Sequence, residues 1–243
     1  AEYPLVAQWL KANAKPLAQI VEGTGLPKYY APLVIPQNGA PSADDTLASV
    51  LLPALGPARG LARALAARAL LRAGQGRTAE AWRDLQACHR LGRLVGSGPT
   101  LIEMLVAIAI DATAAQGDLV FFEQTQPDRQ QAARYQADLA ALPGLPEVAE
   151  KVDVGERFMY LDATQMLARG NGSGFSQLSG GGSSIERLFS WLTARAVDWD
   201  TVLVTGNGWY DRLVAALRIA DRNKRRQALE QLDVELKQLV AST

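Results

Sequence analysis

The sequence predicts an all-α protein, built as an array or bundle of seven to nine helices, and three observations predict it. Apolar residues recur at helical spacing in successive segments of the 243-residue chain. Glycine and proline breaks separate these segments, and the alternating patterns typical of strands are scarce. With 48% hydrophobic and 21% charged residues, the chain has the composition of a globular protein that buries a core.

The N-terminal part combines a broken helix with an irregular stretch. Pro4 suits the first turn of a helix, Pro16 should kink or split that helix, and Gly23 should end it. Six prolines follow within residues 26–57, and this frequency excludes long regular elements there. Residues 42–45 resemble a capping box that could start a short helix inside this proline-rich segment.

Three helices are predicted across the middle of the chain. Residues 58–73 are rich in Ala, Leu and Arg, which favour helix, and the turn at 74–76 should end them. A second helix begins near Thr78, whose hydroxyl can cap it, and continues to about residue 95. The third, 100–125, is apolar almost all round, which predicts a buried central position.

Further helices are predicted in the C-terminal half. They cover residues 128–142, 151–169, 184–197 and 199–221, and a final segment with leucines at 229, 232, 236 and 239. In the second of these helices, Val154 and Phe158 should face the core, and Asp153 should pair with Arg157 one turn later. The glycine-rich stretch 170–184 has the composition of a flexible loop.

The chain is expected to form a single domain over residues 1–243, with a weak division at 170–184 as the alternative. Lys and Arg total 25 and Asp and Glu total 25, so net charge gives no attraction to nucleic acid. One cysteine permits no internal disulfide. No zinc or calcium ligand pattern, phosphate-binding loop or nucleophile motif occurs, so neither a metal nor a cofactor is expected.

Residues 65–94 resemble a tetratricopeptide helix pair. The matching features are the small Ala69, the turn at 74–76, and then Ala81, Leu85 and Cys88 at the spacing of that repeat. Leu65 and Arg72 depart from the family, which favours large aromatic residues there, and a closing proline and a second copy are lacking. The resemblance implies an αα-hairpin and a protein-binding helical repeat.

The whole chain also resembles an uncharacterised bacterial helical family. The segments that carry this resemblance are EYPLVAQWLKAN, KYYAPLV, GRTAEAWRDLQACHRLGRLVGSGPTLIE, VGERFMYLDATQML and WYDRLVAAL. Members of that family are longer proteins with a hydrophobic N-terminal anchor and an exported body. The resemblance therefore implies a fragment of a longer, exported or membrane-anchored chain, and it implies no activity.

Cys88 and His89 are the only cysteine and the only histidine, and they are adjacent. Neighbouring residues on a helix point about 100° apart, so these two cannot meet as nucleophile and base. We expect Cys88 to be a small buried packing residue. His89 should lie at the edge of the apolar face and donate to a carbonyl or carboxylate, whereas a functional His89 would need partners from other helices.

Three carboxylates, Glu103, Asp111 and Asp118, fall within about 80° of one another on the predicted helix 100–125. A buried ionised carboxylate costs several kcal/mol unless it is paired. Pairing is expected with arginines of the helix 58–73, namely Arg59, Arg63, Arg68 and Arg72. The alternative is a polar pocket between helices, in which Asp111 acts as an acid or base of raised pKa.

Two aromatic pairs, Tyr29-Tyr30 and Trp209-Tyr210, lie near irregular backbone. Such residues usually cover the edge of a core and less often line a groove. The sequence leaves both interpretations open.

Three functions remain compatible with the sequence. The first is a non-catalytic helical scaffold that binds a protein or peptide on a groove of stacked helices, without nucleic acid and without a membrane span in this chain. The second is a hydrolase-like or small-molecule enzyme, with Asp111, Glu103 and His89 as candidate catalytic residues. The third is a structural protein that oligomerises through the leucine edge at 229–239.

Overall fold

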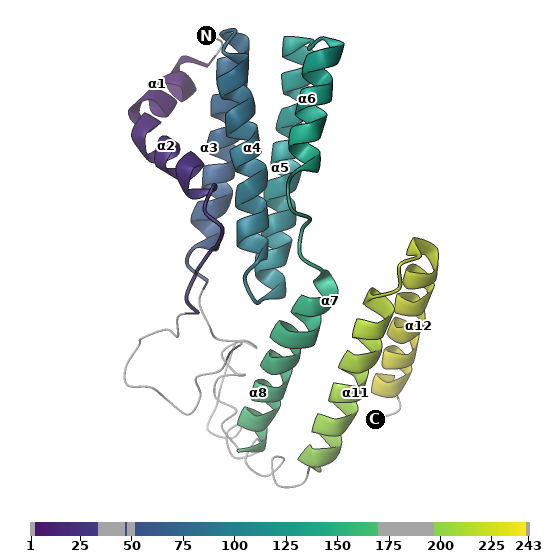
Figure 1. Ribbon diagram of the computed structural model, residues 1–243. Coiled ribbons are helices and arrows are strands. Elements are labelled where there is room, and N and C mark those ends of the chain that lie inside the picture. The colour runs from purple at the N-terminus through teal and green to yellow at the C-terminus, as the bar shows by residue number, and fades with distance from the viewer. Residues whose placement is uncertain (1–2, 34–46, 48–51, 170–196, 242–243) are drawn as a thin grey trace. The chain divides into compact units, whose positions relative to one another are not determined.

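The computed structural model describes residues 3–33, 47, 52–169 and 197–241. Every regular element within these ranges is a helix, and they form nine helices when the contiguous α7, η2 and α8 count as one (Figure 1). This confirms the predicted all-α class. The predicted features at 42–45 and 170–184, and nearly all of the helix predicted at 184–197, lie outside the described residues.

The chain divides into two compact units. Unit 1 comprises residues 1–32 and 52–146, and unit 2 comprises residues 33–51 and 147–243. The expectation of a single domain stays a prediction. Each unit is described below by itself.

Three long helices form the body of unit 1. These are α3 (Leu55–Gly74), α4 (Thr78–Gly96) and α5 (Leu101–Thr125), and each packs against the other two. Figure 1 shows them side by side, and the short connections between them make sequence neighbours antiparallel. The αα-hairpin predicted at 65–94 is therefore present as α3 and α4, while its membership of the tetratricopeptide repeat stays a prediction.

Two shorter helices pack against this bundle. Pro4 begins α1 (Pro4–Ala12), and a break at Asn13 separates it from α2 (Ala14–Gly23), as the prolines and glycine predicted. Both helices contact α3, and α2 also contacts α4. After α5, Asp128 caps the start of α6 (Arg129–Ala140).

Local signals account for the ends of the long helices. Gly76 has φ of +75°, in the left-handed region that glycine adopts freely, and Arg77 N–H donates to the Arg72 carbonyl at 2.9 Å to close α3. Thr78 does not cap α4, contrary to prediction, because the N-cap position is Arg77 and no side chain bonds there. Thr100 caps α5 in a reciprocal capping box.

The prediction that residues 100–125 form the buried central helix is wrong. Instead α4 is the central helix in the sense that it is the most buried of the three: eleven of its 19 residues are buried, against nine of 20 in α3 and eight of 25 in α5. In α5, by contrast, four large apolar residues are between 41% and 59% exposed: Ile102, Leu105, Ile108 and Leu119. In unit 1, therefore, the apolar helix α5 lies on the outside of the bundle.

Unit 2 is built from helices that run almost as predicted. A short α7 (Val148–Glu150), a π-helical turn η2 (Lys151–Glu156) and α8 (Arg157–Ala168) follow one another without a break. The next described helix, α11 (Trp199–Leu217), continues through its two central glycines, which do not interrupt it. It packs against α8 and against α12 (Arg222–Ala241).

Polar contacts organise the packing of α8 on α11. Arg157 binds Asp153 at 2.8 Å, as predicted, and also reaches Asp211 at 2.7 Å. Because this polar side of α8 faces α11, Val154 and Phe158 are more than half exposed instead of lying in the core as predicted.

Candidate functional site

Cys88 is fully buried inside the unit 1 bundle, as predicted. Its Sγ lies 3.6 Å from the Ala62 carbonyl oxygen, and no solvent reaches its side chain. Burial, reinforced by the negative charges of Asp118 and Asp111, raises the pKa of the Cys88 thiol to about 12. The residue therefore stays a neutral packing thiol, and its neighbour His89 points elsewhere.

His89 is buried and lies between two carboxylates of the adjacent helix α5. Its Nδ1 is 2.6 Å from Asp111 Oδ1, and its Nε2 is 2.9 Å from Asp118 Oδ2. Arg93, one turn along α4, also donates to Asp111. We call these four residues the His89 cluster. A functional His89 was expected to need partners from other helices, and Asp111 and Asp118 of α5 are such partners.

The protonation of the His89 cluster follows from its geometry. Burial lowers the pKa of His89, but the hydrogen bonds to Asp118 and Asp111 outweigh it and raise the pKa above its ordinary value. Burial opposes ionisation of Asp111, yet the hydrogen bonds from His89 and Arg93 hold its pKa below the usual range. Both shifts favour the ionised forms of His89 and Asp111, and the raised pKa expected for an acid or base at Asp111 is not found.

This arrangement limits the chemistry that His89 can perform. A general base needs a free ring nitrogen directed at a substrate proton. Both ring nitrogens of His89 are already hydrogen-bonded to carboxylates. The Oδ1 atom of Asp118 is buried and finds no hydrogen-bond partner among the described residues. The His89 cluster is therefore a set of hydrogen bonds between charged groups that holds α4 against α5.

Glu103 does not join the His89 cluster and does not pair with an arginine, contrary to expectation. Its carboxylate accepts hydrogen bonds from Thr100 N–H and Thr100 Oγ1, both at 2.9 Å, in the capping box that begins α5. A side chain at Gly98 would collide with this carboxylate, which accounts for the glycine at that position. The structure thus places His89 beside Asp111, whereas Glu103 lies in the first turn of α5.

Two of the four arginines expected to pair with the α5 carboxylates, Arg68 and Arg72, instead bind a residue that the sequence prediction missed, and Arg59 and Arg63 are exposed. Arg68 donates to Asp84 of α4 through Nε at 2.9 Å and Nη2 at 2.7 Å, and Arg72 donates to Asp84 at 2.6 Å. Arg68 and Asp84 each lie eight residues from Gly76 in the α3–α4 turn. Equal distance from the turn of an antiparallel hairpin was the signal that could have predicted this pair.

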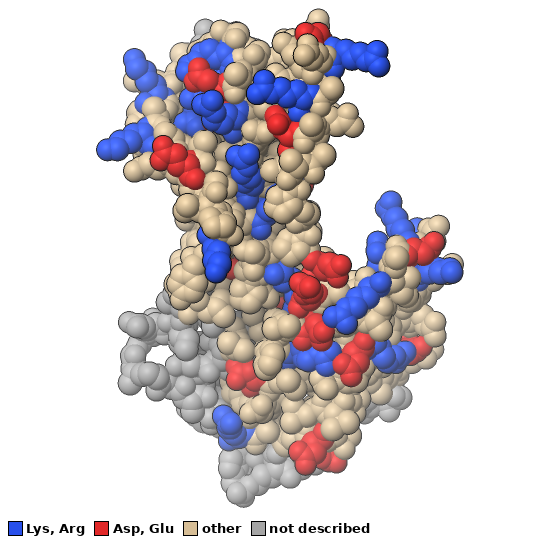
Figure 2. All heavy atoms as spheres, in the orientation of Figure 1, with Lys and Arg blue, Asp and Glu red and all other residues tan. Residues whose placement is uncertain are grey.

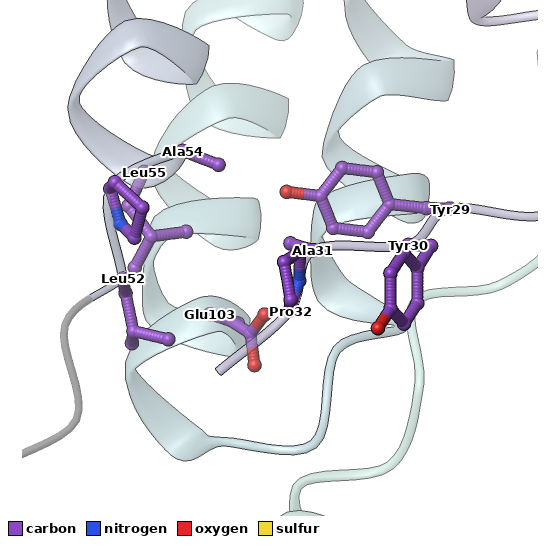
Figure 3. Close-up of a pocket in the computed structure, with 9 residues that line it drawn as sticks. Tyr29, Tyr30, Ala31, Pro32, Leu52, Ala54, Leu55 and Glu103 are labelled. Atoms are coloured by element: carbon purple, nitrogen blue, oxygen red, sulfur yellow. The ribbon is translucent and has the colours of Figure 1, made fainter. Parts of the chain in front are cut away.

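An apolar pocket of about 160 Å³ lies in unit 1, beside the start of α3 (Figure 3). It is lined by Tyr29, Tyr30, Ala31, Pro32, Leu52, Pro53, Ala54, Leu55 and Glu103. The aromatic pair Tyr29-Tyr30 therefore contributes both to the edge of the core and to a pocket wall.

The hydroxyl of Tyr29 is the distinctive polar group of this pocket. Figure 3 shows it pointing into the space between Leu52 and Leu55 on one side and Pro32 on the other. Its oxygen is buried and has no hydrogen-bond partner among the described residues. Burial, and then the charge of Glu103, raises the pKa of Tyr29, so the group remains a protonated donor.

On the face shown in Figure 2, the described residues form no charged patch that is a stronger candidate. Basic and acidic side chains are interspersed there, without a broad region of one sign. Among the described residues, no group of three or more His, Cys, Asp or Glu side chains could hold a metal ion. The pocket and the His89 cluster are therefore the two candidate sites.

Comparison of the chain with protein-family models, with curated proteins and with solved structures found no match. The two family resemblances in the sequence, to a tetratricopeptide pair and to a bacterial helical family, stay predictions.

Proposed function

We propose that this protein is a non-catalytic helical module that binds a protein or peptide segment, with the pocket at Tyr29 receiving an apolar side chain of that segment. The observation that carries this proposal is the unpartnered Tyr29 hydroxyl pointing into an apolar pocket. A buried donor without an acceptor costs free energy, and an occupant that supplies a carbonyl recovers it.

The size and chemistry of the pocket favour a peptide side chain over a larger ligand. Sites for drug-sized molecules typically enclose ~300–1,000 Å³. This pocket encloses about 160 Å³ and is lined mainly by apolar side chains. A leucine or phenylalanine of a bound segment would fill such a space, and its backbone carbonyl would accept from Tyr29.

The charged residues support a binding role more than a catalytic one. His89 and Asp111 neutralise each other inside the bundle, and Glu103 caps a helix. Catalysis by Asp111 and His89, without Glu103, remains the alternative function. It would require the ring of His89 to leave one of its two carboxylates.

Nuclear magnetic resonance titration with N-acetyl-leucinamide tests the proposal, with N-acetyl-alaninamide as the matched weaker probe. We expect the leucine compound to shift the resonances of Tyr29 and Leu55 with a Kd in the millimolar range, as befits a small ligand. Tyr29→Phe should weaken binding roughly 3- to 10-fold, since it removes one hydrogen bond of ~0.5–1.5 kcal/mol. Ala31→Trp should abolish binding by filling the pocket.

Tyr3→Phe is the matched control, because the Tyr3 side chain is 69% exposed and does not line the pocket. It should bind N-acetyl-leucinamide as the wild-type chain does. Equal binding of the leucine and alanine compounds, or undiminished binding by Ala31→Trp, would contradict the proposal.

A further inference from the structure

Glu103 adds a buried carboxylate to the apolar pocket at Tyr29. Of the nine described residues that line this pocket, Glu103 alone is charged, and it is 1% exposed. Figure 3 shows its carboxylate below the Tyr29 hydroxyl, between Leu52 and Pro32. The pocket therefore combines a hydrogen-bond donor and an anionic acceptor with apolar walls.

One oxygen of the Glu103 carboxylate accepts no hydrogen bond within the described part of unit 1. Thr100 N–H and Thr100 Oγ1 both donate to Oε2, each at 2.9 Å. No described residue of unit 1 donates to Oε1, and the buried arginines of this unit pair with other carboxylates. The fold thus removes Glu103 from water without giving it a cation from unit 1, and a bound cation would recover part of that cost.

The negative charge of Glu103 acts on the Tyr29 hydroxyl. Burial, and then this charge, raises the pKa of Tyr29. A group that accepts a hydrogen bond from Tyr29 therefore lies in the electric field of the carboxylate. That field favours a cation beside the accepting group and disfavours an anion there.

We propose that the occupant of the pocket is the N-terminal residue of a peptide or protein, with an apolar side chain and a free α-ammonium group. Its side chain fills the apolar part of the pocket, its carbonyl accepts from the Tyr29 hydroxyl, and its ammonium group donates to Glu103 Oε1. The inference rests on the proposed function, since it names the kind of segment that the pocket receives.

Two other groups could donate to Glu103, and both fit the pocket less well. The amide N–H of an internal residue gives the carboxylate a hydrogen bond but no opposite charge. A lysine side chain carries its ammonium at the end of a long flexible stem, which would take the place of the apolar side chain. A pocket of about 160 Å³ favours the N-terminal residue, because its ammonium group and its side chain share one Cα.

Nuclear magnetic resonance titration of the full chain with leucinamide tests the proposal, with N-acetyl-leucinamide as the matched neutral probe. At about pH 6 the amino group of leucinamide is protonated. We expect leucinamide to bind at least ~5-fold more tightly than N-acetyl-leucinamide, because a hydrogen bond between opposite charges is stronger than one from a neutral amide. N-acetyl-leucine, which brings a second negative charge, should bind more weakly than either.

Glu103→Gln tests the role of the charge. Glutamine serves in a capping box as glutamate does, so the variant should keep the start of α5 and fold. Its affinities for leucinamide and N-acetyl-leucinamide should become equal. Glu123→Gln, exposed on the same helix and outside the pocket, is the matched control and should retain the preference for leucinamide.

Equal affinity of the wild-type chain for leucinamide and N-acetyl-leucinamide, or a preference that persists in Glu103→Gln, would overturn the proposal. So would binding of N-acetyl-lysinamide as tight as that of leucinamide, since the ammonium group would then come from a lysine side chain. The proposed function is tested separately, by the preference for N-acetyl-leucinamide over N-acetyl-alaninamide, so the two failures are distinguishable.

Discussion

Helices α4 and α5 pack against each other in unit 1 and both bury charged side chains, but of the two only α5 exposes large apolar ones. The central helix α4 buries Asp84, 1% exposed, together with His89. The peripheral helix α5 leaves Leu105 and Leu119 more than half exposed. The comparison teaches that the number of neighbouring helices, and not the apolarity of a helix, decides how much of it is buried in this bundle.

The buried charges of α4 are stable because each faces a partner on a different neighbour. Two arginines of α3 donate hydrogen bonds to Asp84, and two carboxylates of α5 are hydrogen-bonded to His89. Buried ion pairs add little net stability but cost much when one partner is removed. They therefore fix the register of α4 against both neighbours.

The largest expected effect comes from removing the charge that α4 presents to α3. Asp84→Ala leaves Arg68 buried without its carboxylate and should lower the free energy of unfolding by ~3–5 kcal/mol. Urea unfolding followed by circular dichroism measures this loss. Arg83→Ala, exposed and next along α4, should change stability by less than ~0.5 kcal/mol. Similar losses of unfolding free energy in Asp84→Ala and Arg83→Ala would contradict the importance of the buried Asp84 pairing.

A smaller effect is expected at Gly92, where α4 lies close to α5. A side chain at Gly92 would place its Cβ 3.1 Å from the Ala107 carbonyl oxygen and 3.4 Å from Ile110. Gly92→Val should therefore destabilise the chain by ~1–3 kcal/mol through overpacking. Gly60→Ala in α3, which has open space for a Cβ, should instead be neutral or stabilise the chain by up to ~1 kcal/mol. Equal thermal midpoints for both variants would contradict a tight α4–α5 contact.

The smallest expected effect is a pH dependence of the His89 cluster. The folded pKa of His89 is raised, so its stabilisation is complete below the unfolded pKa of about 6.5 and is lost as pH rises through the folded value. Above that value the neutral ring has only one N–H for two carboxylates. We expect the free energy of unfolding to fall by about 1 kcal/mol across this range.

Urea unfolding at about pH 6 and about pH 9 measures this change. The chain has no other histidine, but the thiol of Cys88 ionises at about pH 8.5 in the unfolded chain while its folded pKa is about 12, so it also lowers stability toward pH 9. The profiles are therefore compared in a Cys88→Ala background, which removes that titration. The lowered pKa of Asp111 keeps that residue ionised throughout. His89→Asn should show a flatter profile, and a profile as steep as that of the wild-type chain would assign the pH dependence to other groups.

Much of the local structure could be predicted from the sequence, but the partners of the polar residues could not. The turn at Gly76, the split after α1 and the capping residue Asp128 depend on nearest neighbours in the chain, so local patterns reveal them. The Arg68 to Asp84 pair depends on how two helices align across a turn. The pocket at Tyr29 depends on segments far apart in the sequence, and no local pattern specifies its shape.

The sequence by itself determined the all-α class, most helix ends and the separation of Cys88 from His89, because backbone periodicity and turn chemistry act over a few residues. Only the tertiary structure decided that α4 is the central helix, that Asp111 and Asp118 bind His89, and that an apolar face of α5 meets solvent. The physical reason is that periodicity shows which residues share a face, whereas burial depends on the helices that pack against it.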